Sequence, residues 1–110
     1  MHKLMVFIRR PADPAEFEER WSHEFVPRAE RMPGVRRVTL TRVTGGLPGS
    51  LDLHLVHEFY FDDADTLRAA MESPEGRQAG QALMAFASAE VTLTFAEHLE
   101  MDLDNTPGAG

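Results

Sequence analysis

Leu53-His54-Leu55-Val56-His57-Glu58-Phe59-Tyr60-Phe61-Asp62-Asp63 is the stretch that decides the fold, and its pattern predicts a β-strand that runs into a helix cap. A half-buried strand should have one solvated face. Here one parity carries Leu53, Leu55, His57, Phe59 and Phe61, and the other carries His54, Val56, Glu58 and Tyr60. The second face mixes titratable groups with a valine and an aromatic ring. We therefore expect it to form the wall of a cavity, and a solvated face with one exposed tyrosine is the alternative.

The composition is that of one small globular domain. The chain has 110 residues, of which 43% are hydrophobic. Its formal charge of −7 argues against a nucleic-acid partner. No apolar run approaches the roughly 18 residues of a membrane span, and Arg9, Arg10 and Pro11 follow the N-terminal apolar run where a signal peptide would have small residues. Cysteine is absent, which excludes disulfides and thiolate chemistry and fits a cytoplasmic protein.

The remaining periodicities predict the other elements. Asp13 and Pro14 mark the start of a helix that Pro33-Gly34 ends, with a kink expected at Pro27. Strands are predicted over residues 4–8, 35–44, 53–61 and 91–98, and two further helices begin at residues 62–63 and at the cap 73. Residues 104–110 have nothing to bury, so we expect a domain over 1–103 and a loose tail.

The order β-α-β-β-α-α-β is the ferredoxin-like pattern of the α+β class, with its second helix split. Such a fold lays a four-stranded antiparallel sheet under helices on one face only. In the first strand both alternating sets are apolar, so the uncovered face of the sheet is apolar too. A bare apolar face is an association site, and we therefore expect a homodimer with two-fold symmetry that encloses a cavity between its sheets.

Several short motifs together resemble the EthD family of the dimeric α+β barrel superfamily. They are Trp21…Pro27…Met32-Pro33-Gly34-Val35, Leu51-Asp52, Glu58-Phe59-Tyr60-Phe61-Asp62-Asp63 and Ser73-Pro74-Glu75, and the resemblance spans about residues 3–100. It implies a ferredoxin-like protomer, a dimer, and a pocket between sheet and helices. Members of the superfamily include isomerases, cyclases, cofactor-free monooxygenases and haem-binding proteins, so the fold alone does not choose a chemistry.

The sequence departs from the family at one position. EthD proteins commonly carry a histidine two residues before the proline that matches Pro27, and this chain has Phe25 there. The helical histidine His23 lies two residues earlier, which is about 200° around an α-helix. We therefore expect His23 to be exposed unless Pro27 distorts the turn.

Four residues are candidate catalytic groups: Glu58, His54, Tyr60 and His23. Glu58 matches the family's strand glutamate and would act as a general base with a pKa raised by burial. Its alternative is a carboxylate that accepts hydrogen bonds from Arg37, Thr39 or Thr41. His54 shares its parity and would assist it, while Tyr60 would donate a hydrogen bond to a developing oxyanion or simply pack across strands.

No metal or phosphate site is predicted. His54 and His57 are three apart on a strand, so they should face opposite ways and cannot share a metal without a bulge. His57 has the parity of a core histidine. Gly45-Gly46 and Gly49 lack the lysine and the following helix of a phosphate-binding loop.

Two functional hypotheses follow. The first is a cofactor-independent enzyme, of isomerase, cyclase or monooxygenase type, that uses Glu58 to move a proton on a small hydrophobic or aromatic ligand during degradation or secondary metabolism. The second is a non-catalytic binding or accessory protein of an oxidative degradation pathway, which Phe25 favours. A haem-binding dimer ranks behind both, because it needs an axial ligand from His54 or a shifted His23.

Overall fold

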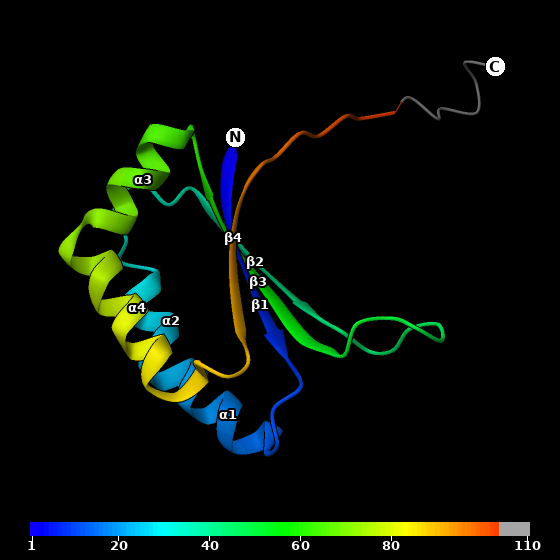
Figure 1. Cartoon of the computed structure of the whole chain (residues 1–110). Coiled ribbons are helices and arrows are strands. Elements are labelled where there is room, and N and C mark those ends of the chain that lie inside the picture. The colour runs from blue at the N-terminus through cyan, green and yellow to red at the C-terminus, as the bar shows by residue number, and fades with distance from the viewer. Residues whose placement is uncertain (104–110) are drawn as a thin grey trace.

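The computed structural model describes residues 1–103 and shows an α+β ferredoxin-like fold. Helices cover one face of a four-stranded sheet and leave the other face open (Figure 1). The tail predicted at 104–110 lies outside the described residues. The elements in chain order are β1 (His2–Arg9), α1 (Pro14–Arg20), the π-helical turn η1 (Trp21–Phe25), α2 (Val26–Ala29), β2 (Arg37–Arg42), β3 (Leu53–Phe61), α3 (Ala64–Glu72), α4 (Pro74–Ala87) and β4 (Val91–Glu97).

The sheet order is β2-β3-β1-β4, and every pairing is antiparallel. Val6 of β1 lies opposite His57 of β3 and Leu93 of β4, so the alternating side chains of the three strands fall on common faces. One face packs against the helices and forms the core. Its strand members with less than a tenth of their surface exposed are Leu4, Val6, Ile8, Leu55, His57, Phe59 and Phe61.

Short polar residues cap the three helices that follow strands or turns, as the sequence predicts. Asp13 accepts a hydrogen bond from the backbone N–H of Glu16, and Asp63 does the same for Thr66. Ser73 caps α4 through the N–H of Gly76. Each cap satisfies one of the donors that the first helical turn leaves free.

The predicted kink at Pro27 takes the form of a π-helical turn. Pro27 has no N–H to offer to the carbonyl of His23, and the turn before it widens, so that the N–H of Val26 donates to the carbonyl of Trp21. This turn carries Trp21 and Phe25 into the core, where they are 4% and 3% exposed.

Gly76 sets the distance between α3 and α4. A Cβ atom at this position would lie 2.1 Å from the carbonyl oxygen of Ala70. We expect Gly76→Ala to lower the free energy of unfolding by about 2 kcal/mol, because one of the two helices must shift. Gly80→Ala is the matched control, since a Cβ there has no atom within 4 Å apart from its chain neighbours and the backbone of its own helix, and the added helix propensity gains about 1 kcal/mol. Urea denaturation measures both, and equal effects at the two glycines would contradict the close approach.

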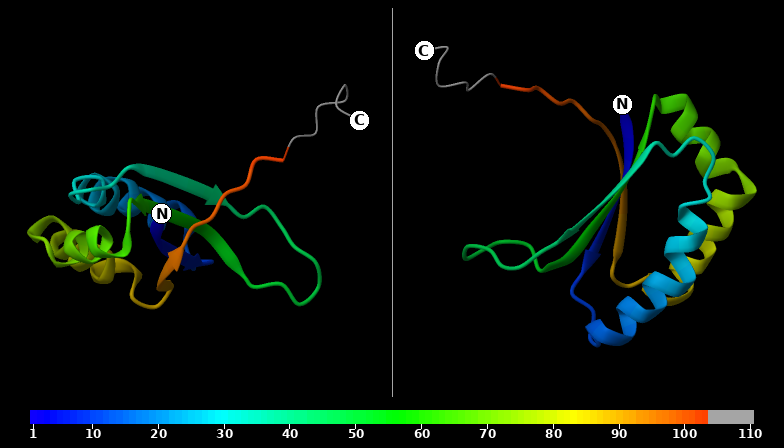
Figure 2. Two further views of the ribbon diagram at one scale, coloured as in Figure 1. Left: turned by 90° about the horizontal axis from the view of Figure 1, so that it is seen from above. Right: turned by 180° about the vertical axis from the view of Figure 1, so that it is seen from behind.

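Two segments project beyond the open face of the sheet. They are the β2–β3 connection, residues 43–52, and the C-terminal arm, residues 98–103, and both leave on the side away from the helices (Figures 1 and 2). The two segments leave from opposite ends of the sheet. The β2–β3 connection joins the start of β3, which pairs with the end of β1 near Ile8 and Arg9. The arm follows the end of β4, which pairs with the start of β1 at His2. Among residues 1–103, no helix is long and apolar enough to cross a membrane.

Candidate functional site

Glu58 lies on the open face in a cluster of polar side chains. Lys3 Nζ lies 2.9 Å from its Oε1, and the hydroxyls of Thr39 and Tyr60 each donate to its Oε2 at 3.1 Å. Burial would raise the pKa of Glu58, but the hydrogen bonds from Lys3, Tyr60 and Thr39 outweigh it and hold this pKa below its ordinary value. The predicted rise in pKa is therefore wrong, and Thr39 is the partner that the alternative interpretation named.

Tyr60 is tied into the same cluster. Its side chain is 4% exposed, and the guanidinium of Arg37 lies 4.3 Å from its ring centroid. Lys3 Nζ is 5.3 Å from the same centroid, and His98 packs against the ring edge at 4.8 Å. Its hydroxyl is directed to Glu58, so the structure brings these two predicted site residues together as hydrogen-bonded partners.

His54 does not join them. The pairing of β1 with β3 shifts between Ile8 and Arg9, so that residue 54 is an extra residue opposite β1. This bulge turns His54 to the helix face, where its ring meets Phe17 edge-on and Nε2 lies 3.6 Å from Glu18 Oε1, too far for a hydrogen bond. Burial, with help from Arg10 and Arg42, lowers the pKa of His54. The prediction that His54 shares a face with Glu58 is wrong.

The bulge also places His54 and His57 on the same face, contrary to the expectation from their spacing. They contact different neighbours, and among residues 1–103 there is no group of three or more histidine or carboxylate side chains able to hold a metal ion. His23 lies exposed on η1, and its Nδ1 is 2.8 Å from the carbonyl of Glu19. The π-turn therefore does not bring His23 into the interior.

The interior itself contains a polar pair that sequence reasoning undervalued. His57 is 3% exposed and sits among aromatic rings, with centroid distances of 5.0 Å to Trp21, 6.1 Å to Phe25 and 4.4 Å to Phe59. Its Nδ1 and the Nε1 of Trp21 are buried and have no hydrogen-bond partner among the described residues. Burial lowers the pKa of His57 to about 4, so the ring is neutral at pH 7.

Such unpaired buried groups are uncommon, because each costs about 1–3 kcal/mol in lost hydration. The sequence held one signal of this site: His57 is the polar member of an otherwise apolar parity in β3. The pairing with Trp21 carried no sequence signal, because the π-turn positions that ring.

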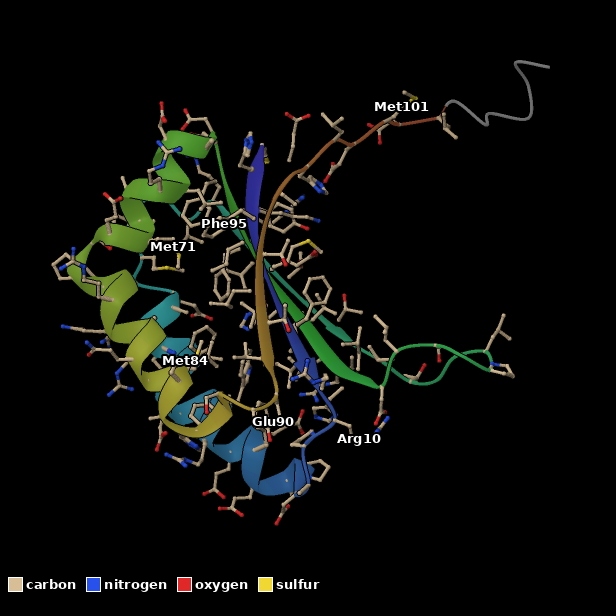
Figure 3. The ribbon with its side chains drawn as sticks, viewed as in Figure 1. Arg10, Met71, Met84, Glu90, Phe95 and Met101 are labelled. Atoms are coloured by element: carbon tan, nitrogen blue, oxygen red, sulfur yellow. The ribbon has the colours of Figure 1, made fainter. Side chains whose placement is uncertain are left out.

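A largely apolar cleft opens between α3 and β4, and neither Trp21 nor His57 lines it. The helices leave β4 uncovered, so Leu93 and Phe95 are 37% and 61% exposed although they share the helix-facing parity. Phe95 and Met71 lie in the space between β4 and α3, in a cleft of about 350 Å³ (Figure 3). A smaller pocket of about 20 Å³ lies next to it, shares Met71, and reaches Phe25 and Val6. Phe25 thus contacts His57 on one side and the small pocket on the other.

The chain is similar to several known proteins. The EthD domain family matches residues 9–90. An uncharacterized 11.0 kDa protein in the thcB-thcC intergenic region of Rhodococcus erythropolis is 31% identical over 99 residues, which cover 88% of this chain and 94% of that one. The crystal structure of an EthD family protein from Bacillus halodurans shares 32% identity with a TM-score of 0.85, covering 90% of this chain and 99% of that one.

More distant structures share the fold. SnoaB, a cofactor-independent oxygenase from Streptomyces nogalater, is 25% identical with a TM-score of 0.60, and the match covers 94% of this chain and 96% of that one. Three further structures with 16–18% identity and TM-scores of 0.58–0.63 are described as dimeric proteins of ferredoxin-like fold. Because the family match covers residues 9–90, and a solved EthD family protein shares 32% identity over 90% of this chain, the chain belongs to the EthD domain family.

Proposed function

We propose that the protein is a homodimer that binds a small hydrophobic molecule, aromatic or lactone-like, in the cleft between helices and sheet. The observation that carries the proposal is the pair of unpaired buried atoms, Trp21 Nε1 and His57 Nδ1, in an aromatic interior that the ring of Phe25 separates from the narrow part of the cleft. Pockets for small ligands are mostly apolar and have a few polar groups that fix orientation. A phenolic or enolic hydroxyl of the ligand would satisfy both nitrogens, by accepting from Trp21 Nε1–H and donating to His57 Nδ1.

The exposed wall of the cleft is mainly apolar and suits a hydrophobic molecule. Ala64, Leu67, Met71 and Phe95 line its wide part together with His2, Arg68 and Glu72, and Met71 is shared with the narrow part. Methionine adapts its shape to a ligand at little cost. Phe25 stands between the narrow part and His57, so a ligand oxygen reaches the nitrogens when this ring turns aside.

The chemistry proposed is a cofactor-independent proton transfer. His57 would take the proton from a phenolic or enolic oxygen as the oxyanion forms beside it, because that negative charge opposes the burial that lowers the pKa of His57. The Trp21 N–H would stabilise the same oxyanion. Glu58, to which the sequence assigned this step, is a weaker candidate, because its carboxylate already accepts from Lys3, Thr39 and Tyr60. The likeness to SnoaB, named as a cofactor-independent oxygenase, supports chemistry of this class.

The second candidate is a carrier or accessory protein that binds such a molecule and leaves it unchanged. Phe25 favours it, because this ring occupies the position of the family's histidine and packs against His57 instead of offering a second titratable group to the cleft.

The experiment uses 2-naphthol and naphthalene as probes, because they differ by one hydroxyl. Trp21 is the chain's one tryptophan, so quenching of intrinsic fluorescence reports binding at the site. We expect 2-naphthol to bind about tenfold more tightly than naphthalene, as one buried hydrogen bond of about 1–1.5 kcal/mol provides. Calorimetry on His57→Phe should abolish this preference, whereas Glu58→Gln should retain it.

Equal affinities for the two probes in the unmodified protein would contradict the polar site. Mass spectrometry of the naphthol recovered after incubation in air then distinguishes an enzyme from a carrier. An enzyme would convert the naphthol to a product of different mass, and a carrier would leave it unchanged.

A further inference from the structure

The C-terminal arm, residues 98–103, has the pattern of a strand that lacks its partner. It continues from β4 without secondary structure, and its side chains alternate between apolar and polar. Leu99, Met101 and Leu103 are 80%, 82% and 71% exposed in the single chain. Three large apolar side chains on one parity of an extended segment form an exposed apolar stripe of the kind that marks an interaction surface.

The start of the arm is fixed to the open face of its own sheet. The His98 ring packs on the edge of Tyr60, and Glu100 pairs with Arg37 at 2.7 Å. From this anchor the arm leads away from the sheet, on the side opposite the helices, and Met101 lies far from the core (Figure 3). The arm therefore points toward whatever molecule faces the open side.

A groove of matching chemistry lies at the other end of the same face. It has a volume of about 280 Å³, and we name it the hairpin-end groove; its lining residues are Phe7, Arg9, Leu51, Asp52, Leu53, Thr92 and Thr94. Most of its wall is apolar, and its one carboxylate, Asp52, already pairs with Arg10 at 3.0 Å. The guanidinium of Arg9 donates to the carbonyl of Ala89 at 2.6 Å and has no carboxylate partner among residues 1–103. The arm offers both complements, namely three apolar side chains and the exposed carboxylate of Asp102.

An arm does not reach the groove of its own protomer, because the length of the sheet separates them. A two-fold axis that lies between two facing sheets and runs across their strands exchanges the two ends. It brings the arm of one protomer to the hairpin-end groove of its partner, and the reverse.

We propose that in the homodimer the arm, residues 98–103, of each protomer docks in the hairpin-end groove of the partner. Leu99, Met101 and Leu103 cover the groove floor, and Asp102 approaches Arg9 across the interface. This inference rests on the homodimer of the proposed function and adds the orientation and the occupant of the groove. It leaves the ligand site on the helix face untouched.

Cysteine cross-linking tests the arrangement cleanly, because the chain contains no cysteine. Met101→Cys and Leu53→Cys place one thiol on the arm and one in the groove. Under mild oxidation, an equimolar mixture of the two single variants should give a disulfide-linked dimer that contains one chain of each. Either variant alone should stay unlinked. Efficient linking of Met101→Cys to itself would show that the arms meet each other, and it would overturn the proposal.

Truncation gives an independent test by sedimentation equilibrium. Removal of residues 99–110 should raise the dimer dissociation constant at least about 100-fold, because three large apolar side chains per protomer lose their cover. Removal of residues 104–110 alone is the control and should change it less than threefold. A full-length protein that is monomeric would refute the homodimer and this inference, while naphthol binding remains a separate measurement. A dimer that both truncations leave equally stable would refute the arm docking alone.

Discussion

Acidification from pH 7 to pH 4 is expected to lower the free energy of unfolding by about 3 kcal/mol through His57 alone. The pKa of His57 is about 4 in the folded chain and about 6.5 in an unfolded one. Between these values the unfolded chain binds a proton that the folded chain rejects. The stabilisation is therefore complete above pH 6.5 and is lost as the pH falls toward 4, at about 1.4 kcal/mol for each unit of pKa difference.

His57→Phe removes this titration and keeps a ring of similar shape in the aromatic cluster. At pH 7 we expect its stability to stay within about 1 kcal/mol of the unmodified protein, because an unpaired buried nitrogen is lost along with the histidine. At pH 4.5 the variant should be the more stable by about 2 kcal/mol. Urea denaturation at fixed protein concentration measures both values, with the exposed His23→Gln as control.

If the slope of stability against pH is the same in His57→Phe and in the unmodified protein, His57 is not the buried neutral group that the structure shows. The same outcome would remove the support for a polar ligand site at this residue. The His23 variant should keep the full slope, since its ring stands in solvent.

Lys3→Met is expected to have the second large effect, by leaving the carboxylate of Glu58 without its cation. The side chains of this pair are 13% and 15% exposed, so water screens the lone charge poorly. We expect a loss of about 2–3 kcal/mol at pH 7, somewhat below the cost of breaking a fully buried pair. Adding Glu58→Gln should return stability to within about 1 kcal/mol, because the double variant buries no charge.

The pH dependence of stability should have opposite signs in Lys3→Met and in the unmodified protein, which makes it the more decisive test. With Lys3 present, the pKa of Glu58 is lowered, so its contribution is present above pH 4.5 and is lost as the pH falls below that. Without Lys3, burial raises the pKa of Glu58 in the folded chain, and the variant should gain stability as the pH falls from 7 to 5. Chemical denaturation of the variant at pH 7 and at pH 5 measures this. A variant that loses stability as the pH falls from 7 to 5 would show that Thr39 and Tyr60 suffice to stabilise the charge of Glu58.

The element order was predictable because the sequence signals for each helix and strand lie within or next to that element. The caps Asp13, Asp63 and Ser73, the apolar run of β1 and the alternation of β3 all lie within a few residues of what they determine. The site depended on contacts between segments. Parity counting placed His54 beside Glu58, and one extra residue in the register moved it to the other face.

The chemistry of Glu58 was misjudged for the same kind of reason. A strand carboxylate has a raised or a lowered pKa according to what stands on the neighbouring strands, and Lys3 reaches it from the far end of the chain. The Trp21 and His57 rings meet only because the helical segment packs on the sheet with one particular rotation about its own axis, and their unpaired nitrogens follow from that contact. Sequence alone gives neither the register nor that rotation.

The widened turn before Pro27 also explains why the buried side chains of this helical segment recur every four residues. On a regular α-helix, 12 residues turn about 120° away from a whole number of turns, so Phe17 and Ala29 would point in different directions. Both are buried, as are Trp21 and Phe25 between them. The π-turn takes more residues to complete each revolution and so cancels the drift. It acts as a phase correction that keeps a single line of side chains directed at the sheet through the whole segment.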